Sequence, residues 1–150
     1  MDEKLDLDVK KSIVMSSACF KVLNDDEITE LAELLVEEHF KAGEVVVTKG
    51  DTVKSVFFIV SGTAEVQNTS VDNGVTRADK LAELGPTDTI GLSETGLFSL
   101  SGRRTATVVA KTDMILLRLN VLVFNGFVLS HSHVYRTLNA LAEVPGKDDL

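Results

Sequence analysis

The period of the hydrophobic pattern changes twice along the chain, and this is the strongest constraint on its fold. Up to about residue 38 apolar side chains recur at helical spacing, and from Ala42 they alternate with a period of two, in short runs separated by turns. After Asn120 the helical spacing returns. Short strands at turn spacings of about ten residues are typical of an antiparallel sandwich or barrel. We therefore predict an α+β fold, in which an antiparallel, jelly-roll-like β-roll of about eight strands lies between N-terminal and C-terminal helices.

Two N-terminal helices are predicted within residues 3–38. A modest apolar stripe with a spacing of four residues marks the first helix. Asn24 and Glu27 have the spacing of a capping box. The second helix is therefore predicted from Asp25 to Glu38.

Two C-terminal helices are predicted where the helical spacing returns. The first covers Asn120–Leu129, with Asn120 as a favourable N-cap, and the second covers Ser132–Glu143. With the β-roll over residues 42–119, these helices assign residues 1–150 to a single domain, as the length also favours.

The strands are predicted from β-rich runs bounded by turn residues. A polar stretch, 68–79, has Asn73 and Gly74 at its centre and is interpreted as the tip of a hairpin. The segment 85–104 contains several glycines and one proline, which makes it too irregular for one element. The predicted strands are Val45–Thr48, Val56–Val60, Thr63–Gln67, Lys80–Leu84, Thr105–Ala110 and Met114–Leu119.

Charge and cysteine content restrict the partners and the compartment. The 15 Lys and Arg residues against 23 Asp and Glu residues give a net charge of -8, which disfavours DNA or RNA as the main partner. The single cysteine, Cys19, excludes an internal disulfide, and the charged N-terminus lacks the order of a secretory signal. No uncharged apolar run approaches the ~18 residues of a membrane helix. We expect a cytoplasmic protein without direct membrane insertion.

The irregular segment is the feature with the clearest chemistry, because it ends in two adjacent arginines. Arg103 and Arg104 stand immediately before a predicted strand, which would fix their direction. Glycines allow backbone N–H groups to approach an anion closely, and a guanidinium binds phosphate oxygens in a bidentate way. The pattern favours a phosphate-binding loop.

Three segments of the chain resemble the cyclic nucleotide-binding domain family. FKVLNDDEITELAELLVEEHFKAGEVVVTKGDTVKSVFFIVSGTAEV (20–66) is similar to the first half of such a domain, and LAELGPTDTIG (81–91) and GRRTATVVA (102–110) are similar to the second half. The resemblance covers about residues 20–143. The family includes catabolite activator proteins, the regulatory regions of protein kinases A and G, and cyclic-nucleotide-gated channels.

The resemblance implies a set of ligand-binding residues around the family's phosphate-binding cassette. Arg104 matches the arginine that binds the cyclic phosphate, and Glu94 would bind the ribose 2'-hydroxyl only with a one-residue slip or a bulge. The interval of thirteen residues from Gly91 to Arg104 is longer than in the family, and Thr87 stands where the family commonly has glycine. Thr105 resembles a threonine that contacts guanine in cGMP-preferring members, although cAMP-responsive members carry it too. The predicted ligand-binding residues are Gly91, Glu94, Thr95, Gly96, Leu97, Arg103, Arg104 and Thr105.

The function expected from the resemblance is a non-catalytic sensor. It would bind cAMP or cGMP in the β-roll, without another cofactor, and relay binding through the C-terminal helices to a partner protein or a fused effector domain. Val134, Leu138 and Leu141 would form the apolar stripe of a lid, with Tyr135 and Arg136 on its flank. Two alternatives stay open: a degenerate fold that acts as a protein-interaction module, and a β-roll that binds a different small anionic ligand.

For the histidines, Ser93 and Cys19 we predict structural or exposed positions and no chemical role. His131 and His133 have HxH spacing, but residues two apart on a helix diverge, so we predict helix capping or exposure and no metal site. His39 is expected to end the helix predicted up to Glu38, where a partial positive charge is favourable. Ser93 lies in an incomplete nucleophile-elbow pattern without a plausible histidine partner, so no enzyme is predicted. Cys19 is expected to be buried in the core.

Overall fold

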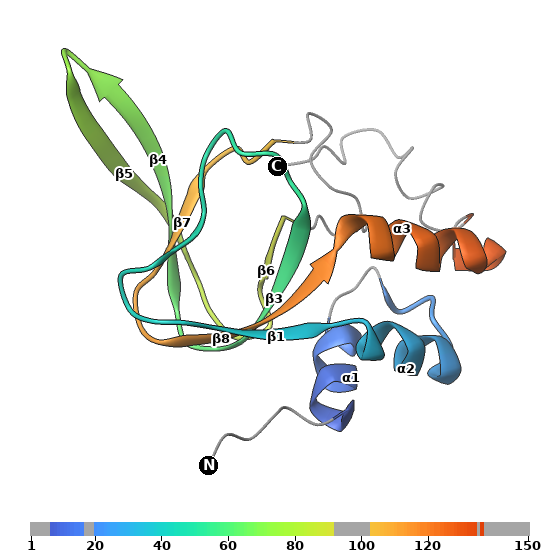
Figure 1. Ribbon diagram of the computed structural model, residues 1–150. Helices are drawn as coiled ribbons and strands as arrows, with labels where there is room; N and C mark the ends of the chain where they lie inside the picture. The colour runs from blue at the N-terminus through green and yellow to red at the C-terminus, as the bar shows by residue number, and fades with distance from the viewer. Residues whose placement is uncertain (1–6, 17–19, 92–102, 135, 137–150) are drawn as a thin grey trace.

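The computed structural model of the chain describes residues 7–16, 20–91, 103–134 and 136. It confirms the predicted fold class: two antiparallel four-stranded sheets form a β-roll between N-terminal and C-terminal helices (Figure 1). The elements are α1 (Leu7–Met15), α2 (Asp25–Glu33), β1 (Val36–Phe40), β2 (Val45–Val47), β3 (Ser55–Ser61), β4 (Ala64–Asp72), β5 (Val75–Leu84), β6 (Thr89–Ile90), β7 (Thr107–Ala110), β8 (Met114–Asn120) and α3 (Val121–Ser130).

Strand order brings segments from the two ends of the roll together. One sheet has the order β1-β8-β3-β6 and the other the order β2-β7-β4-β5. The β4–β5 hairpin extends beyond the rest of the roll, on the side away from the helices (Figure 1). Its tip is Asn73 and Gly74, with φ angles of 52° and 78°, which confirms the predicted turn. The strands run up to this turn, so the predicted polar loop 68–79 is too long.

The helix predicted from Asp25 to Glu38 ends five residues early, at Glu33. Its start is confirmed, because Asn24 and Glu27 form the reciprocal bonds of a capping box. Residues 36–40 instead form β1, which pairs with β8 in continuous register. No glycine or proline marks this change in the sequence, so tertiary strand pairing decides it. The prediction that His39 ends a helix is therefore wrong, since His39 lies in β1 and its ring contacts Glu37.

The boundaries of the remaining helices and strands differ less from the predicted ones. Strand β7 begins at Thr107 and not at Thr105. The two-residue β6 lies within the segment that was expected to be irregular. The N-cap Asn120 is confirmed, because its side chain accepts hydrogen bonds from the first turn of α3. None of the helices in the described part of the chain is long and apolar enough to cross a membrane.

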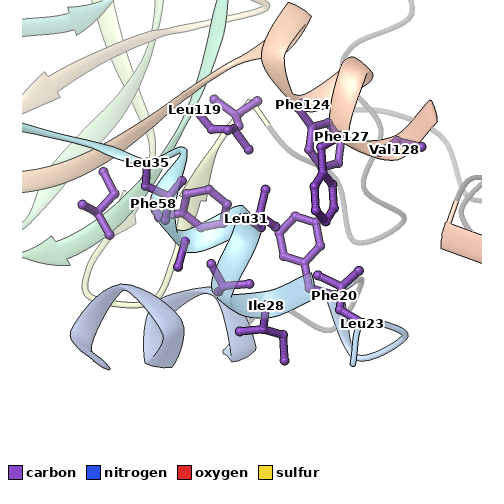
Figure 2. Close-up of a cluster of buried hydrophobic side chains, with 14 of the residues drawn as sticks. Phe20, Leu23, Ile28, Leu31, Leu35, Phe58, Leu119, Phe124, Phe127 and Val128 are labelled. Carbon is purple, nitrogen blue, oxygen red and sulfur yellow. The ribbon is translucent and has the colours of Figure 1, made fainter. Parts of the chain in front are cut away.

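Buried side chains form two clusters on opposite faces of β3 and β8. Within the roll, Phe57 and Ile59 pack with residues of the second sheet. On the other face, Phe58 and Leu119 pack against the helices (Figure 2). Phe20 joins this helical cluster to the sheet, with its ring centroid 6.1 Å from that of Phe58 and 5.8 Å from that of Phe124. Because successive β3 residues alternate between the clusters, the strand is buried on both faces.

Phe57, Phe58, Phe124 and Phe127 are buried in the core, while Phe98 and Cys19 lie outside the described residues. Val134, expected in a lid stripe, is 1% exposed and belongs to the helical cluster. Leu138, Leu141 and Tyr135 are outside the described residues, and Arg136 is exposed.

Candidate ligand-binding site

The segment before β7 is held in place by the turn that follows β2. The Arg104 N–H donates to the Asp51 carbonyl at 2.8 Å, and the Gly50 N–H donates to the Arg104 carbonyl at 2.9 Å. The neighbouring Arg103 side chain donates through Nη1 to the Gly50 carbonyl at 3.0 Å. These bonds fix the backbone of Arg104 before the strand begins.

The Arg104 side chain turns toward the start of β3. Its Nη2 donates to the Ser55 carbonyl at 2.6 Å, and its Cζ lies 6.0 Å from the centre of the Phe57 ring. Its Nη1 is buried, and among the described residues it is the one buried side-chain nitrogen or oxygen without a hydrogen-bond partner. Burial lowers the pKa of the guanidinium, and the charge of Asp51 partly opposes this effect. The site therefore holds a cation with an unused, desolvated N–H group.

Gly91 closes the other side of this guanidinium. It directly follows β6, whose Ile90 pairs with Phe57 on β3. Its φ angle is +87°, and a Cβ built on it would lie 2.5 Å from Arg104 Nη1. Glycine is thus required here both by the backbone conformation and by the space that the guanidinium occupies.

The structure brings only two of the predicted ligand-binding residues together. Gly91 and Arg104 are brought together, whereas the Arg103 side chain lies at the exposed surface on Gly50, and Thr105 is exposed. The other predicted residues, Glu94, Thr95, Gly96 and Leu97, lie outside the described residues.

Sequence reasoning missed two contributors to the site, Ser55 and Phe57. Ser55 acts through its backbone carbonyl, which has no sequence signature. Phe57 is a buried aromatic residue of an apolar strand, which in the sequence alone indicates a core position. Its proximity to Arg104 follows only from the pairing of strands.

Thr87, which precedes β6, has an unfavourable backbone conformation. Its φ angle is +75°, although it is β-branched, and its N–H donates to the Ile59 carbonyl at 2.9 Å. The departure from the family's glycine at this position therefore has a conformational cost.

A separate surface pocket of about 450 Å³ lies at the other end of β3. It is lined by Phe40, Ser61 and Met114 among others. Ser61 is the last residue of the seven-residue strand that begins at Ser55, so about 20 Å of strand separate the pocket from Arg104. The pocket is therefore distinct from the predicted ligand site.

The two histidines of the HxH pair lie against helix α2. His131 is the C-cap of α3, and both His131 and His133 contact the carboxylate of Glu27 on α2. The prediction of a capping role is confirmed for His131. Within the described ranges, no three His, Cys, Asp or Glu side chains are arranged to hold a metal ion.

Comparison with known proteins defines the class. The sequence matches the cyclic nucleotide-binding domain family over residues 37–131, and the chain belongs to this family. It is 26% identical to the N-terminal domain of a transcriptional regulator from Streptomyces coelicolor A3(2), with a TM-score of 0.72 and 87% of each chain covered. It has the fold of the regulatory domain of Toxoplasma gondii protein kinase A in complex with cAMP, at 22% identity and a TM-score of 0.67, covering 83% of this chain and 46% of that chain.

A curated protein also matches. Over 113 residues the chain is 34% identical to Glutaminase 2 of Bradyrhizobium diazoefficiens. The match covers 75% of this chain but spans only 16% of that enzyme's length.

Proposed function

We propose that residues 1–150 form a single, non-catalytic regulatory domain that binds a cyclic nucleotide, cAMP or cGMP, with Arg104 as its principal charge. The observation that carries this proposal is the buried Nη1 of Arg104, which has no hydrogen-bond partner among the described residues. An unsatisfied buried donor costs about 1–3 kcal/mol, and more when it is charged. An anionic oxygen placed at Nη1 would recover this cost.

A cyclic phosphate suits the site because it carries a single negative charge and two exocyclic oxygens. Nη2 already donates to Ser55, while Nη1 lies against Gly91, where a side chain would collide with it. The guanidinium is held by its backbone and by Ser55, so little conformational entropy is lost when the ligand binds. The arrangement favours a compact anion over an extended one.

The remaining site residues are assigned by the family resemblance. Gly91 would allow close approach, Glu94 would accept the ribose 2'-hydroxyl, and Arg103 would have a secondary role because its Nη1 donates to Gly50. Thr95, Gly96, Leu97 and Thr105 complete the proposed set. A 2'-deoxy analogue should bind more weakly to the wild type and about equally weakly to the Glu94→Gln variant. An unchanged affinity for the analogue would remove Glu94 from the set.

The proposed output is a shift in the C-terminal helices. Phe124 and Phe127 of α3 pack into the cluster that covers β3 and β8, so a change at Ser55 is transmitted through one strand to α3. We expect bound nucleotide to increase amide-exchange protection more in residues 120–143 than in residues 45–67. A uniform change would mean binding without switching. The proposed recipient is a partner protein or fused effector in the cytoplasm, and the short match to the much longer glutaminase supports a fused domain.

Calorimetric titration with cAMP and cGMP tests the proposed nucleotide binding. We expect the Arg104→Ala variant to bind cAMP or cGMP about ten- to a hundredfold more weakly than the wild type, since charge-assisted hydrogen bonds contribute about 1.5–3 kcal/mol. Arg77→Ala is the matched control, because it removes an exposed guanidinium on β5 outside the proposed site and should leave the affinity unchanged. Equal affinities of wild type and Arg104→Ala would exclude Arg104 from the site.

One observation favours a second candidate, a degenerate domain or one that binds another small anion. Leu92 follows Gly91, and the interval to Arg104 is thirteen residues, longer than in the family. Absence of cAMP and cGMP binding to the wild type at millimolar concentration would establish this second candidate.

A further inference from the structure

A second group of ionisable side chains lies where α2 meets the end of α3. Glu27, in the first turn of α2, is only 6% exposed. Its Oε1 accepts the N–H of Asn24 at 2.8 Å, which closes the capping box. Its Oε2 lies 2.5 Å from His133 Nε2 and 3.6 Å from His131 Nδ1. One carboxylate thus binds both the start of α2 and the segment that follows α3.

A second carboxylate completes the group. Glu30, one turn further along α2, places Oε1 3.1 Å from His131 Nε2. Both ring nitrogens of His131 therefore face acidic side chains, and its ring centroid is 4.8 Å from that of Phe127. The imidazole is held from three sides.

The chain after His131 is also fixed by packing. The Val134 N–H donates to the His131 carbonyl at 2.9 Å, and the Val134 side chain lies in the helical cluster with Phe20 and Leu31. Of the α1 lysines, Lys11 is 3.6 Å from Asp25 at the beginning of α2, and Lys10 donates to the Leu35 carbonyl at 3.1 Å. The carboxylates of Glu27 and Glu30 are therefore directed at the two histidines.

We propose that Glu27, Glu30, His131 and His133 form a clasp that holds the chain leaving α3 on the N-terminal helices. The partners are about one hundred residues apart in the sequence, from 101 for His131 and Glu30 to 106 for His133 and Glu27. Burial of Glu27 excludes competing water and strengthens its contacts. The clasp sets the position from which the C-terminal segment continues.

The clasp has a consequence for regulation, and this consequence alone rests on the proposed function. A nucleotide that moves α3 must either move α2 with it or open the clasp. The strength of the clasp would then set how much of the ligand's differential affinity reaches the C-terminal segment.

The test separates the clasp from the helix cap. Glutamine is also favourable at the fourth position of a capping box. Glu27→Gln should therefore keep the bond to Asn24 and lose only the charge that faces the histidines. In ligand-free protein we expect amide exchange at His131 and Val134 to be about tenfold faster than in the wild type, and exchange at Ile28 to be unchanged. Glu33→Gln, an exposed glutamate of the same helix, is the control and should change none of these amides.

A double-mutant cycle completes the test. His133→Gln should give a similar acceleration, and the double variant should exchange no faster than either single variant, because all three lack the same contact. If Glu27→Gln fails to fold, His133→Gln carries the measurement alone. Unchanged exchange at His131 and Val134 in both single variants, or effects that add, would overturn the proposal. Since no nucleotide is present, failure of this test is distinct from failure of nucleotide binding.

Discussion

The carboxylate of Glu27 and the guanidinium of Arg104 are both removed from water, but they differ in whether their polar atoms have partners within the chain. Both oxygens of Glu27 have partners within the chain, from Asn24 and the two histidines. Arg104 has one nitrogen on Ser55 and a buried Nη1 without a partner among the described residues. Native proteins leave few buried polar atoms unpaired. The difference supports a structural role for Glu27 and the proposal that Arg104 binds a group from outside the chain.

The largest expected effect is the difference in unfolding free energy between a variant without the Glu27 charge and a variant without the Arg104 charge. Glu27→Ala should lower the free energy of unfolding by about 2–3 kcal/mol, because it removes a helix cap and leaves two histidines without their acceptor. Arg104→Ala should lower it by less than about 1 kcal/mol, since an unsatisfied buried donor is removed as well. Urea unfolding at neutral pH measures both. A larger loss for Arg104→Ala would reverse the interpretation of the two groups.

A methyl group at Gly91 tests how tightly the guanidinium is enclosed. Gly91→Ala and Gly43→Ala should each lose about 1–2 kcal/mol of stability, because both glycines have positive φ angles. Gly91→Ala should lose about 1 kcal/mol more. Its Cβ would lie 2.5 Å from Arg104 Nη1, whereas a Cβ at Gly43 has nothing within 4 Å.

Thermal unfolding of the two glycine variants compares them directly. Gly91→Ala should also weaken nucleotide binding, while Gly43→Ala should leave the affinity unchanged. Equal stabilities together with equal affinities would show that the guanidinium moves aside without cost.

Thr87 tests whether its backbone conformation lowers the stability of the fold. Thr87→Gly should raise the free energy of unfolding by about 0.5–1 kcal/mol, because glycine adopts a positive φ angle without the steric cost of a β-branched side chain. Asn73→Gly, at a φ of 52° in the hairpin tip, is the control and should change stability less, since asparagine tolerates this region. A loss of stability in Thr87→Gly would show that its side chain contributes more than its backbone costs.

The smallest effect is a difference in pH dependence. Burial by itself raises the pKa of Glu27, but the Asn24 N–H and the contacts with His133 and His131 outweigh it, so the pKa lies below the ordinary glutamate value. A carboxyl group with a lowered pKa in the folded state stabilises the protein above its unfolded pKa, and this stabilisation is lost as pH falls through the folded pKa. The stability difference between wild type and Glu27→Gln should therefore persist from about pH 7 to 5 and disappear below it.

Arg104 provides the contrast in the same titration. Its pKa is lowered by burial from a very high value, and arginine stays protonated throughout this range. The difference between wild type and Arg104→Ala should therefore not vary with pH over the acid range. A parallel decline in both differences would mean that the acid transition has another origin.

The elements that depend on local interactions could be predicted from the sequence. The capping box of Asn24 and Glu27, the Asn73 and Gly74 turn, and the N-cap Asn120 all lie where the residue pattern placed them. Each of these devices joins residues no more than a few positions apart. The arginine of the candidate site was also found this way, because its motif is contiguous in the sequence.

Long-range pairing decided the rest. Residues 36–38 continue a helical pattern in the sequence, but they belong to the strand β1 because β8 pairs with residues 36–40 in continuous register. Ser55, Gly91 and Arg104 meet only because β3 pairs with β6 and the segment before β7 crosses the start of β3. The histidines reach Glu27 across 106 residues or fewer. Such contacts depend on how whole elements pack. The sequence around a residue does not show which distant groups this packing places next to it.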